Sequence, residues 1–298
     1  MKKLVVIIGP TASGKSDLAI YLAQKYSGEV ISADSRQIYR KLDLGTGKVQ
    51  KDPNKRDFYS EGVRHYLLDI QDVQNQYTVV DFQKDAKKAL KEIEEKNKLP
   101  IICGGTPYYI ISFLQGWKFP KVKVSQELRE ELNKKEIKDL LKILNKLNPS
   151  LAKTIEKNKR RIIRAIEVNQ EIKTNKIEKN PLKRDILILG IDKDINEVRE
   201  LIKKRLNKRI SKGMIKEIND LKKENISSQK LDDLGLEYRY INRFLENKLT
   251  KEEAIEQLNF KIGQFAKRQI TWFKKFPNVN WVKTKKQAEQ ILKNFINK

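Results

Sequence analysis

The stretch Leu4-Val5-Val6-Ile7-Ile8-Gly9-Pro10-Thr11-Ala12-Ser13-Gly14-Lys15-Ser16 decides the fold class of this chain. Its first five residues form an apolar run typical of a buried strand, and residues 15–26 continue as a helix. Between them, Gly9 to Ser16 fits the pattern G-x-x-x-x-G-K-[ST] in the strand-to-helix context that supports it. The sequence therefore predicts a phosphate-binding loop.

The loop's chemistry follows from its residue types. Backbone N–H groups converge on phosphate oxygens, and the helix that follows adds its positive N-terminal end. Lys15 supplies a point charge, and Ser16 supplies a hydroxyl suited to Mg²⁺, which makes Ser16 the predicted metal ligand. We expect the phosphates to be bound by Gly9, Thr11, Ala12, Ser13, Gly14, Lys15 and Ser16.

The acidic residue that a kinase or ATPase commonly carries at a strand end is missing from its usual place. The apolar stretch Ile101-Ile102-Cys103 runs into Gly104-Gly105-Thr106 without an acid. The available acid is Asp34, which follows the second predicted strand. The loop is therefore interpreted as a diphosphate site in an enzyme other than an ordinary ATPase.

The outer parts of the chain alternate strand and helix patterns. Apolar strands are predicted at 29–32, 100–103 and 185–191, and a helix over 81–97 in which Phe82, Ala86, Leu90 and Ile93 recur at helical spacing. Such alternation is typical of an α/β fold with a parallel sheet flanked by helices, here of the P-loop NTPase-like kind.

The middle of the chain differs from both ends. Residues 118–182 are rich in Lys, Glu and Leu at helical spacing and contain no clear strand. We predict a catalytic core made of 1–117 plus 183–298, with 118–182 as a small all-helical insertion domain.

Composition limits the kinds of site that the chain can build. It has 298 residues, with one cysteine (Cys103) and one histidine (His65), too few for a disulfide framework or a Cys/His zinc site. No apolar run is long enough to span a bilayer, and no secretory signal is apparent, so we expect a cytoplasmic protein that does not bind membranes. The net charge of +25 suggests a polyanionic partner, although lysines on solvated faces are an alternative explanation.

Eight segments, in this order along the chain, resemble the tRNA dimethylallyltransferases, the isopentenyl-diphosphate:tRNA transferase family. The combination of Asp34-Ser35-Arg36-Gln37 with Lys267-Arg268-Gln269 is far more specific than a phosphate loop alone. The segments cover nearly the whole chain and are Gly9–Ser16, Ile31–Tyr39, Leu44–Lys48, His65–Asp69, Tyr77–Phe82, Leu99–Thr106, Arg161–Val168 and Ala266–Phe273.

The resemblance implies transfer of a dimethylallyl group from dimethylallyl diphosphate to the N6 amine of the adenosine on the 3′ side of a tRNA anticodon. It implies that Asp34 is the general base, that Thr106 and Arg209 stabilise the departing diphosphate, and that Arg268 supports the diphosphate. A turn-capping role for Asp34 and a turn hydroxyl for Thr106 are the simpler alternatives. About one helical turn is missing near Arg209 relative to the family pattern, which leaves its role open.

The resemblance also implies an RNA partner, the anticodon stem-loop of tRNA, whose target base must be flipped out of its stack. The expected tRNA contacts are Asp34, Ser35, Arg36, Gln37 and Thr106 in the core and Arg129, Arg160, Arg161 and Arg164 in the insertion. We expect the protein to be a monomer. A solvated basic face paired with Glu167 and Glu171 is the alternative for these arginines.

Three other functions remain open at this stage. An adenylate isopentenyltransferase would share the donor site but would not need the insertion or the charge. A small-molecule kinase would use the loop for ATP, and a non-catalytic RNA-binding protein would keep a vestigial loop. The sequence does not tell which tRNAs are modified, how fast, or whether Arg268 and Gln269 belong to the site or to the core.

Overall fold

The computed structural model describes residues 2–120, 122, 125–172 and 178–297. The chain divides into two compact units, one made of Met1–Leu114 with Lys183–Lys298 and one made of Gln115–Leu182. The second unit begins three residues before the 118 expected for the insertion and ends at the expected 182. Each unit has its own apolar core.

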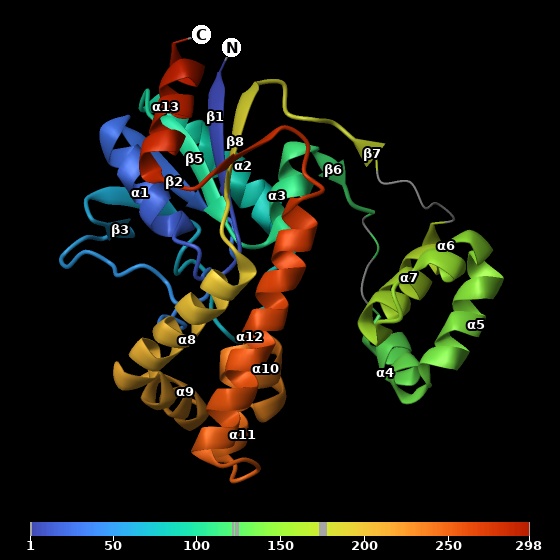
Figure 1. The fold of residues 1–298 in the computed structure, drawn as a ribbon. Coiled ribbons are helices and arrows are strands. Elements are labelled where there is room, and N and C mark those ends of the chain that lie inside the picture. Colours follow the sequence, from blue (N-terminus) through green and yellow to red (C-terminus); the bar gives the residue numbers. More distant parts are fainter. Residues whose placement is uncertain (1, 121, 123–124, 173–177, 298) are drawn as a thin grey trace. The chain divides into compact units, whose positions relative to one another are not determined.

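The first unit is built on a seven-stranded sheet with the order β3-β4-β2-β5-β1-β8-β9 (Figure 1). All neighbours in it are parallel except the β3–β4 pair. The strands are β1 (Lys3–Ile8), β2 (Gly28–Ser32), β3 (Tyr59–Ser60), β4 (Val63–Tyr66), β5 (Leu99–Gly104), β8 (Asp185–Ile191) and β9 (Val279–Val282).

Strand β1 lies between β5 and β8, and its residues Leu4 to Ile8 are fully buried. On one face, Val5 and Ile7 pack with Leu18 and Leu22 of helix α1 (Lys15–Lys25) and with Leu292. Because alternate residues of a strand face opposite sides, both faces of the sheet need a helical cover. Helices on the two sides of the sheet provide it (Figure 1).

The other helices of the first unit either cover the sheet or form a bundle in which α12 packs against α3, α8 and α11. The predicted helix over 81–97 is confirmed as α2, which begins two residues earlier at a Thr78–Asp81 capping box. They are α2 (Val79–Glu95), α3 (Pro107–Leu114), α8 (Ile195–Ser211), α9 (Met214–Lys223), α10 (Ser228–Leu234), α11 (Leu236–Leu245), α12 (Lys251–Phe273) and α13 (Lys285–Ile296).

The second unit packs its helices around a small apolar core of Leu132, Leu140, Leu144, Ile162, Ile163 and Ile166. The prediction of an all-helical insertion is corrected by a two-residue ladder, Trp117 with Lys179 and Lys118 with Glu178. These pairs form where the chain enters and leaves the unit, too short to give a strand pattern in the sequence. The elements are β6 (Trp117–Lys118), α4 (Gln126–Lys134), α5 (Ile137–Leu147), α6 (Pro149–Thr154), α7 (Lys159–Glu171) and β7 (Glu178–Lys179).

Candidate active site

The phosphate-binding loop turns sharply between β1 and α1 because two of its residues adopt the left-handed backbone region. Gly14 has φ 89° and Ala12 has φ 61°. A Cβ at Gly9 would lie 2.8 Å from the Ser13 Oγ, so only glycine fits there without a shift. The Ser13 hydroxyl is buried and has no hydrogen-bond partner among the described residues. An unpartnered buried hydroxyl inside such a loop fits a site that an anion completes.

Lys15 lies at the start of α1, and its ammonium donates a hydrogen bond to the Pro10 carbonyl at 3.2 Å. Burial lowers the pKa of Lys15, the negative charge of Asp34 opposes this shift, and the nearby Arg205 adds to it. A bound anion would favour the charged form of the lysine. The electrostatics of the loop therefore suit a phosphate ligand.

Asp34 follows β2, and its side chain caps the turn that begins there. Its Oδ1 accepts hydrogen bonds from the backbone N–H of Arg36 at 2.9 Å and of Gln37 at 3.4 Å. Within the described part of the chain, no hydrogen bond to the other carboxylate oxygen is recorded. The turn-capping role that the sequence left as an alternative is thus present, and it still leaves one oxygen for a substrate.

Thr106 joins the ends of β5 and β2. Its Oγ1 accepts a hydrogen bond from Ser35 N–H at 3.1 Å, and its own N–H donates to the Ala33 carbonyl at 3.2 Å. A Cβ at Gly104 would lie 2.1 Å from that carbonyl oxygen, so the two strand ends touch through backbone alone. The proposed base and the proposed leaving-group residue therefore lie on adjoining turns.

Gln269 answers the question that the sequence left open about the Arg268-Gln269 pair. Its side-chain Oε1 accepts from Thr11 N–H at 2.8 Å, and its Nε2 donates to the Gly105 carbonyl at 2.6 Å. The buried amide thus links α12 to the phosphate loop and to the turn that carries Thr106. Arg268 is exposed, with its guanidinium 5.9 Å from the Phe265 ring centroid, so its predicted diphosphate role stays a prediction.

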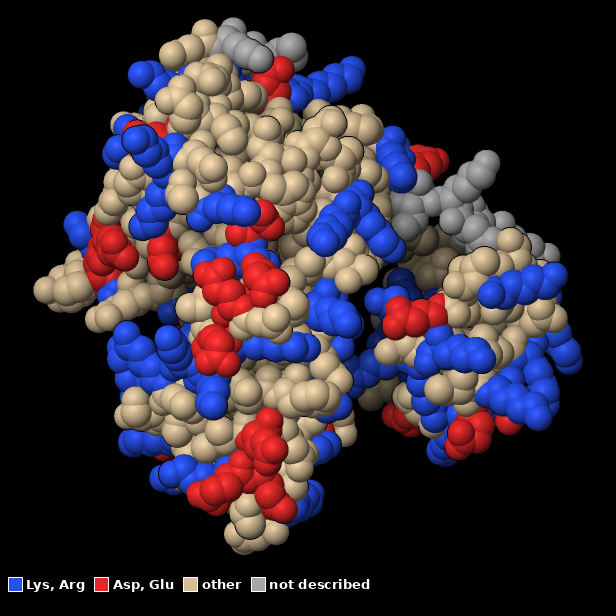
Figure 2. Space-filling model, viewed as in Figure 1, with Lys and Arg blue, Asp and Glu red and all other residues tan. Residues whose placement is uncertain are grey.

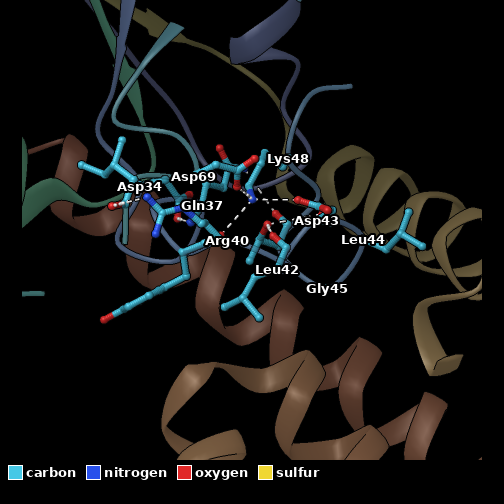
Figure 3. Close-up of polar contacts among 12 residues, drawn as sticks. Asp34, Gln37, Arg40, Leu42, Asp43, Leu44, Gly45, Lys48 and Asp69 are labelled. Atoms are coloured by element: carbon cyan, nitrogen blue, oxygen red, sulfur yellow. Dashed lines mark hydrogen bonds and ion pairs between the residues drawn. The ribbon is translucent and has the colours of Figure 1, made fainter. Parts of the chain in front are cut away.

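The segment from Gln37 to Lys48 forms a wall beside Asp34 (Figure 3). Lys48, with a side chain only 1% exposed, pairs with Asp43 at 2.7 Å and with Asp69, and donates to the Tyr39 carbonyl at 3.0 Å. The Gln37 amide nitrogen lies 3.3 and 3.4 Å from the carbonyls of residues 46 and 47. Gln37 is thereby held with its donor group committed, which leaves its amide oxygen as an acceptor.

Glu217 of α9 fixes the middle of the same segment. Its carboxylate accepts backbone N–H groups from Asp43 at 3.1 Å, Leu44 at 2.7 Å and Gly45 at 2.9 Å, and the Tyr238 hydroxyl at 3.0 Å. A Cβ at Gly45 would lie 2.3 Å from the Tyr238 ring, so the close approach requires glycine. Glu217 was not predicted from the sequence, where no local pattern marks it.

Two arginines of α8 complete this wall. Arg209 donates to the Gly45 carbonyl and pairs with Glu237 at 3.0 Å, whereas Arg205 donates to the Gly47 carbonyl at 2.6 Å. Arg209, predicted near the leaving group, is buried and engaged with the wall. Arg205 was not predicted from the sequence, although its position four residues before Arg209 places it on the same helix face and could have indicated it.

A pocket of about 700 Å³ opens on the phosphate loop and lies wholly within the first unit. Seven basic side chains line it against three acidic ones, and two of those acids, Asp43 and Asp69, are paired with Lys48. Asp34 and Gln37 line a smaller neighbouring hollow that also contains Lys15 and Ser16. The two spaces therefore meet at the start of α1.

A sequence model described as IPP transferase matches residues 37–276. The chain belongs to the IPP transferase family. Relatives of this IPP transferase include tRNA dimethylallyltransferase 2 of Treponema denticola, 41% identical over 93% of this chain and 95% of the relative. Another is tRNA dimethylallyltransferase 2 of Bacteroides fragilis, 38% identical over 98% of this chain and 96% of the relative.

Solved structures agree with this membership. A full-length tRNA isopentenylpyrophosphate transferase from Bacillus halodurans matches with a TM-score of 0.72 at 31% identity, over 100% of this chain and 96% of that one. A eukaryotic dimethylallyltransferase, described as acting on tRNA, matches with a TM-score of 0.83 at 26% identity, over 100% of this chain and 80% of that one. The predicted P-loop NTPase-like α/β fold is confirmed.

In the second unit of this IPP transferase, three of the four arginines predicted there to bind tRNA form ion pairs within the unit. Arg129 and Arg164 both pair with the buried Glu167, Arg164 at 2.9 Å. Pairing of these arginines with Glu167 is the alternative to tRNA binding that the sequence left open. Arg160 and Arg161 are exposed, and Arg161 pairs with Glu156. Lys and Arg side chains are spread widely over the visible surface (Figure 2).

The donor set around the phosphate loop fits a weakly held hard cation. The described residues contain no group of three or more His, Cys, Asp or Glu side chains able to hold a metal ion by themselves. Ser16 and Asp34 line the same hollow. Mg²⁺ commonly takes few protein ligands and completes its shell with phosphate oxygens and water, so these residues are compatible with a Mg²⁺ bound together with a diphosphate.

None of the described helices has the length and apolar character needed to cross a membrane.

Proposed function

We propose that this IPP transferase moves the dimethylallyl group of dimethylallyl diphosphate to the N6 amine of the adenosine on the 3′ side of a tRNA anticodon. The observation that carries the proposal is the meeting of the phosphate loop with the turns of Asp34 and Thr106 at the carboxyl ends of β1, β2 and β5. Ligands of open α/β sheets collect at this edge. The curated relatives named tRNA dimethylallyltransferases support it.

In the proposed reaction, the N6 lone pair forms a bond to the first carbon of the isoprenoid as the bond from that carbon to the diphosphate oxygen breaks. The proton that N6 loses is accepted by Oδ2 of Asp34, because Oδ1 holds the turn. The Thr106 hydroxyl accepts from Ser35 N–H at 3.1 Å and donates to the Ser35 hydroxyl at 3.4 Å, and in the proposed reaction its hydrogen turns from that long bond to the departing oxygen.

The charge of the leaving diphosphate is met by the loop. Lys15 and the backbone N–H groups of the loop stabilise the negative charge that develops on the diphosphate. Ser16 would supply a hydroxyl ligand to Mg²⁺, whose contribution when bound is to neutralise diphosphate charge. Gln269, which holds both the loop and the Thr106 turn, is a positioning residue for these groups.

For the RNA, Gln37 offers an amide oxygen to a base amine, because its nitrogen is committed to the wall. Arg160 and Arg161 of α7 are exposed cations suited to phosphate contacts, Arg161 alongside its ion pair with the exposed Glu156. The ion pairs of Arg129 and Arg164 with Glu167 stabilise the insertion, in addition to any contact that these two arginines make with RNA.

We propose that the enzyme acts as a cytoplasmic monomer.

The direct test is to incubate the protein with unmodified tRNA, Mg²⁺ and dimethylallyl diphosphate, digest the RNA, and weigh its nucleosides. We expect one added dimethylallyl group on the adenosine beside the anticodon, and none on a matched tRNA that carries guanosine there. Product on AMP, ADP or ATP but not on tRNA would instead make the chain an adenylate isopentenyltransferase.

The role of Thr106 is tested with Thr106→Val, which keeps the shape and removes the hydroxyl. We expect single-turnover rates to fall by about 10- to 100-fold, because the departing oxygen loses a hydrogen-bond donor, with donor affinity within about threefold. Thr106→Ser keeps the hydroxyl and is expected to recover most of the rate. Weaker donor binding at an unchanged rate would assign Thr106 to ground-state binding only.

A further inference from the structure

Helix α8 carries a cationic face whose members have two different environments. Arg205, Lys208 and Arg209 of α8 and its C-cap residue Lys212 recur at i, i+3, i+4 and i+7, and all four line the pocket at the phosphate loop. The arginines are engaged with the carbonyls of residues 45 and 47. Lys208 and Lys212 are exposed, and no ion pair from either to a described acidic residue is recorded.

Like charges one helical turn apart repel each other. Lys208 and Lys212 stand in this relation, with the buried Arg209 between them. Lys51 adds a further exposed cation to the lining of the same pocket. Several cations that repel one another within one pocket are suited to a ligand with several negative charges.

The position of the pocket selects the ligand. Its lining includes Lys15 and Ser16 but not Asp34 or Gln37, the residues proposed to meet the acceptor base. At about 700 Å³, it falls within the range of about 300–1,000 Å³ common for small-molecule sites. A small polyanion can therefore pass from the lysines to the phosphate loop without crossing the acceptor side.

We propose that Lys51, Lys208 and Lys212 form an entrance for the isoprenoid diphosphate, which they draw into the pocket by long-range attraction before it reaches Lys15. This inference rests on the proposed function for the identity of the donor. Exposed charges act over about a Debye length, near 10 Å at 0.1 M salt, and mainly raise association rates. They contribute little to the barrier of the chemical step, because they do not touch the reacting atoms.

The test is the double charge reversal K208E/K212E in the full chain, measured with dimethylallyl diphosphate as the varied substrate. We expect kcat/KM for the donor to fall by about tenfold or more at low ionic strength and by about twofold or less at 0.5 M salt. The neutral pair K208Q/K212Q should lie between these and the unchanged protein. Turnover at saturating donor and the KM for tRNA should match those of the control pair.

The control pair K203E/K204E makes the same charge change on α8 at exposed lysines that do not line the pocket. Equal losses in both pairs would reduce the effect to net charge and overturn the proposal. A rise in the KM for tRNA with an unchanged donor KM would assign this face to RNA instead.

A separate measurement keeps the inference independent of the transfer reaction. Calorimetric binding of inorganic diphosphate, at low salt and without RNA, should be weakened by K208E/K212E relative to K203E/K204E, even if no prenylated tRNA is formed. If K208E/K212E and K203E/K204E bound inorganic diphosphate with equal affinity, the proposed entrance would be contradicted. If the nucleoside assay found no dimethylallyl group on the tRNA after the reaction, only the proposed reaction would be contradicted.

Discussion

Replacing Asp34 with asparagine is expected to lower the single-turnover rate of adenosine prenylation by about a thousandfold, within the range of 10²–10⁴ typical of a lost general base. Asparagine keeps the Oδ1 that accepts from the N–H groups of Arg36 and Gln37, so the turn should persist. It replaces the other oxygen with an NH₂ group, which cannot take a proton from the adenine amine. The measurement is a quenched single-turnover assay at saturating donor and tRNA.

Asp72→Asn is the matched control for this change. Asp72 also accepts a backbone N–H two residues ahead, from Gln74 at 2.8 Å, but on an exposed loop that lines none of the pockets described here. We expect its rate within about twofold of the unchanged protein, and we expect both variants to melt within a few degrees of it, by the relation of melting point to lost stability. A near-normal rate for Asp34→Asn would place the proton acceptor elsewhere.

Three of the four strands that the sequence predicted, at 4–8, 100–103 and 185–191, contain continuous apolar runs, and the strands that it missed lack that signal. Strand β9 is only Val279–Val282 and includes an asparagine. The β3–β4 hairpin turns at Glu61 and Gly62, both with positive φ, and the usual marker of such a turn is Asn-Gly or Asp-Gly. Short strands of this kind gain their stability from neighbours that lie far away in the sequence.

The phosphate loop was predictable because its chemistry lies in eight consecutive residues. The wall at 37–48 was not, because its partners come from distant segments. Glu217 lies more than 170 residues beyond the N–H groups that it binds. Gln269 could be placed in the site or the core only once the structure joined it to Thr11 and Gly105. Long-range hydrogen bonds of this kind leave no periodic pattern in the sequence.

The second large effect is expected at Gly104, where β5 meets the turn of Asp34. In Gly104→Ala, the new Cβ would lie 2.1 Å from the Ala33 carbonyl oxygen and 2.7 Å from the Ala33 Cα, so backbone must move. That carbonyl accepts the Thr106 N–H, and the neighbouring Ala33 N–H donates to the Cys103 carbonyl at 2.8 Å. We expect a stability loss of about 3 kcal/mol, at the upper end of overpacking costs.

Because the displaced residues flank Asp34 and Thr106, the same variant should lose about a hundredfold in turnover, as expected for a misplacement near 1 Å. Gly263→Ala is the control, since its Cβ would find only ordinary contact at 3.8 Å inside α12. A mid-helix glycine costs about 0.5–1 kcal/mol relative to alanine, so this control should melt higher and keep its rate. Differential scanning calorimetry and the single-turnover assay measure the two effects. If Gly104→Ala melted and reacted like the unchanged protein, the strand ends would have to be free to separate, and the contact between Ala33 and Gly104 would not be what aligns base with leaving group.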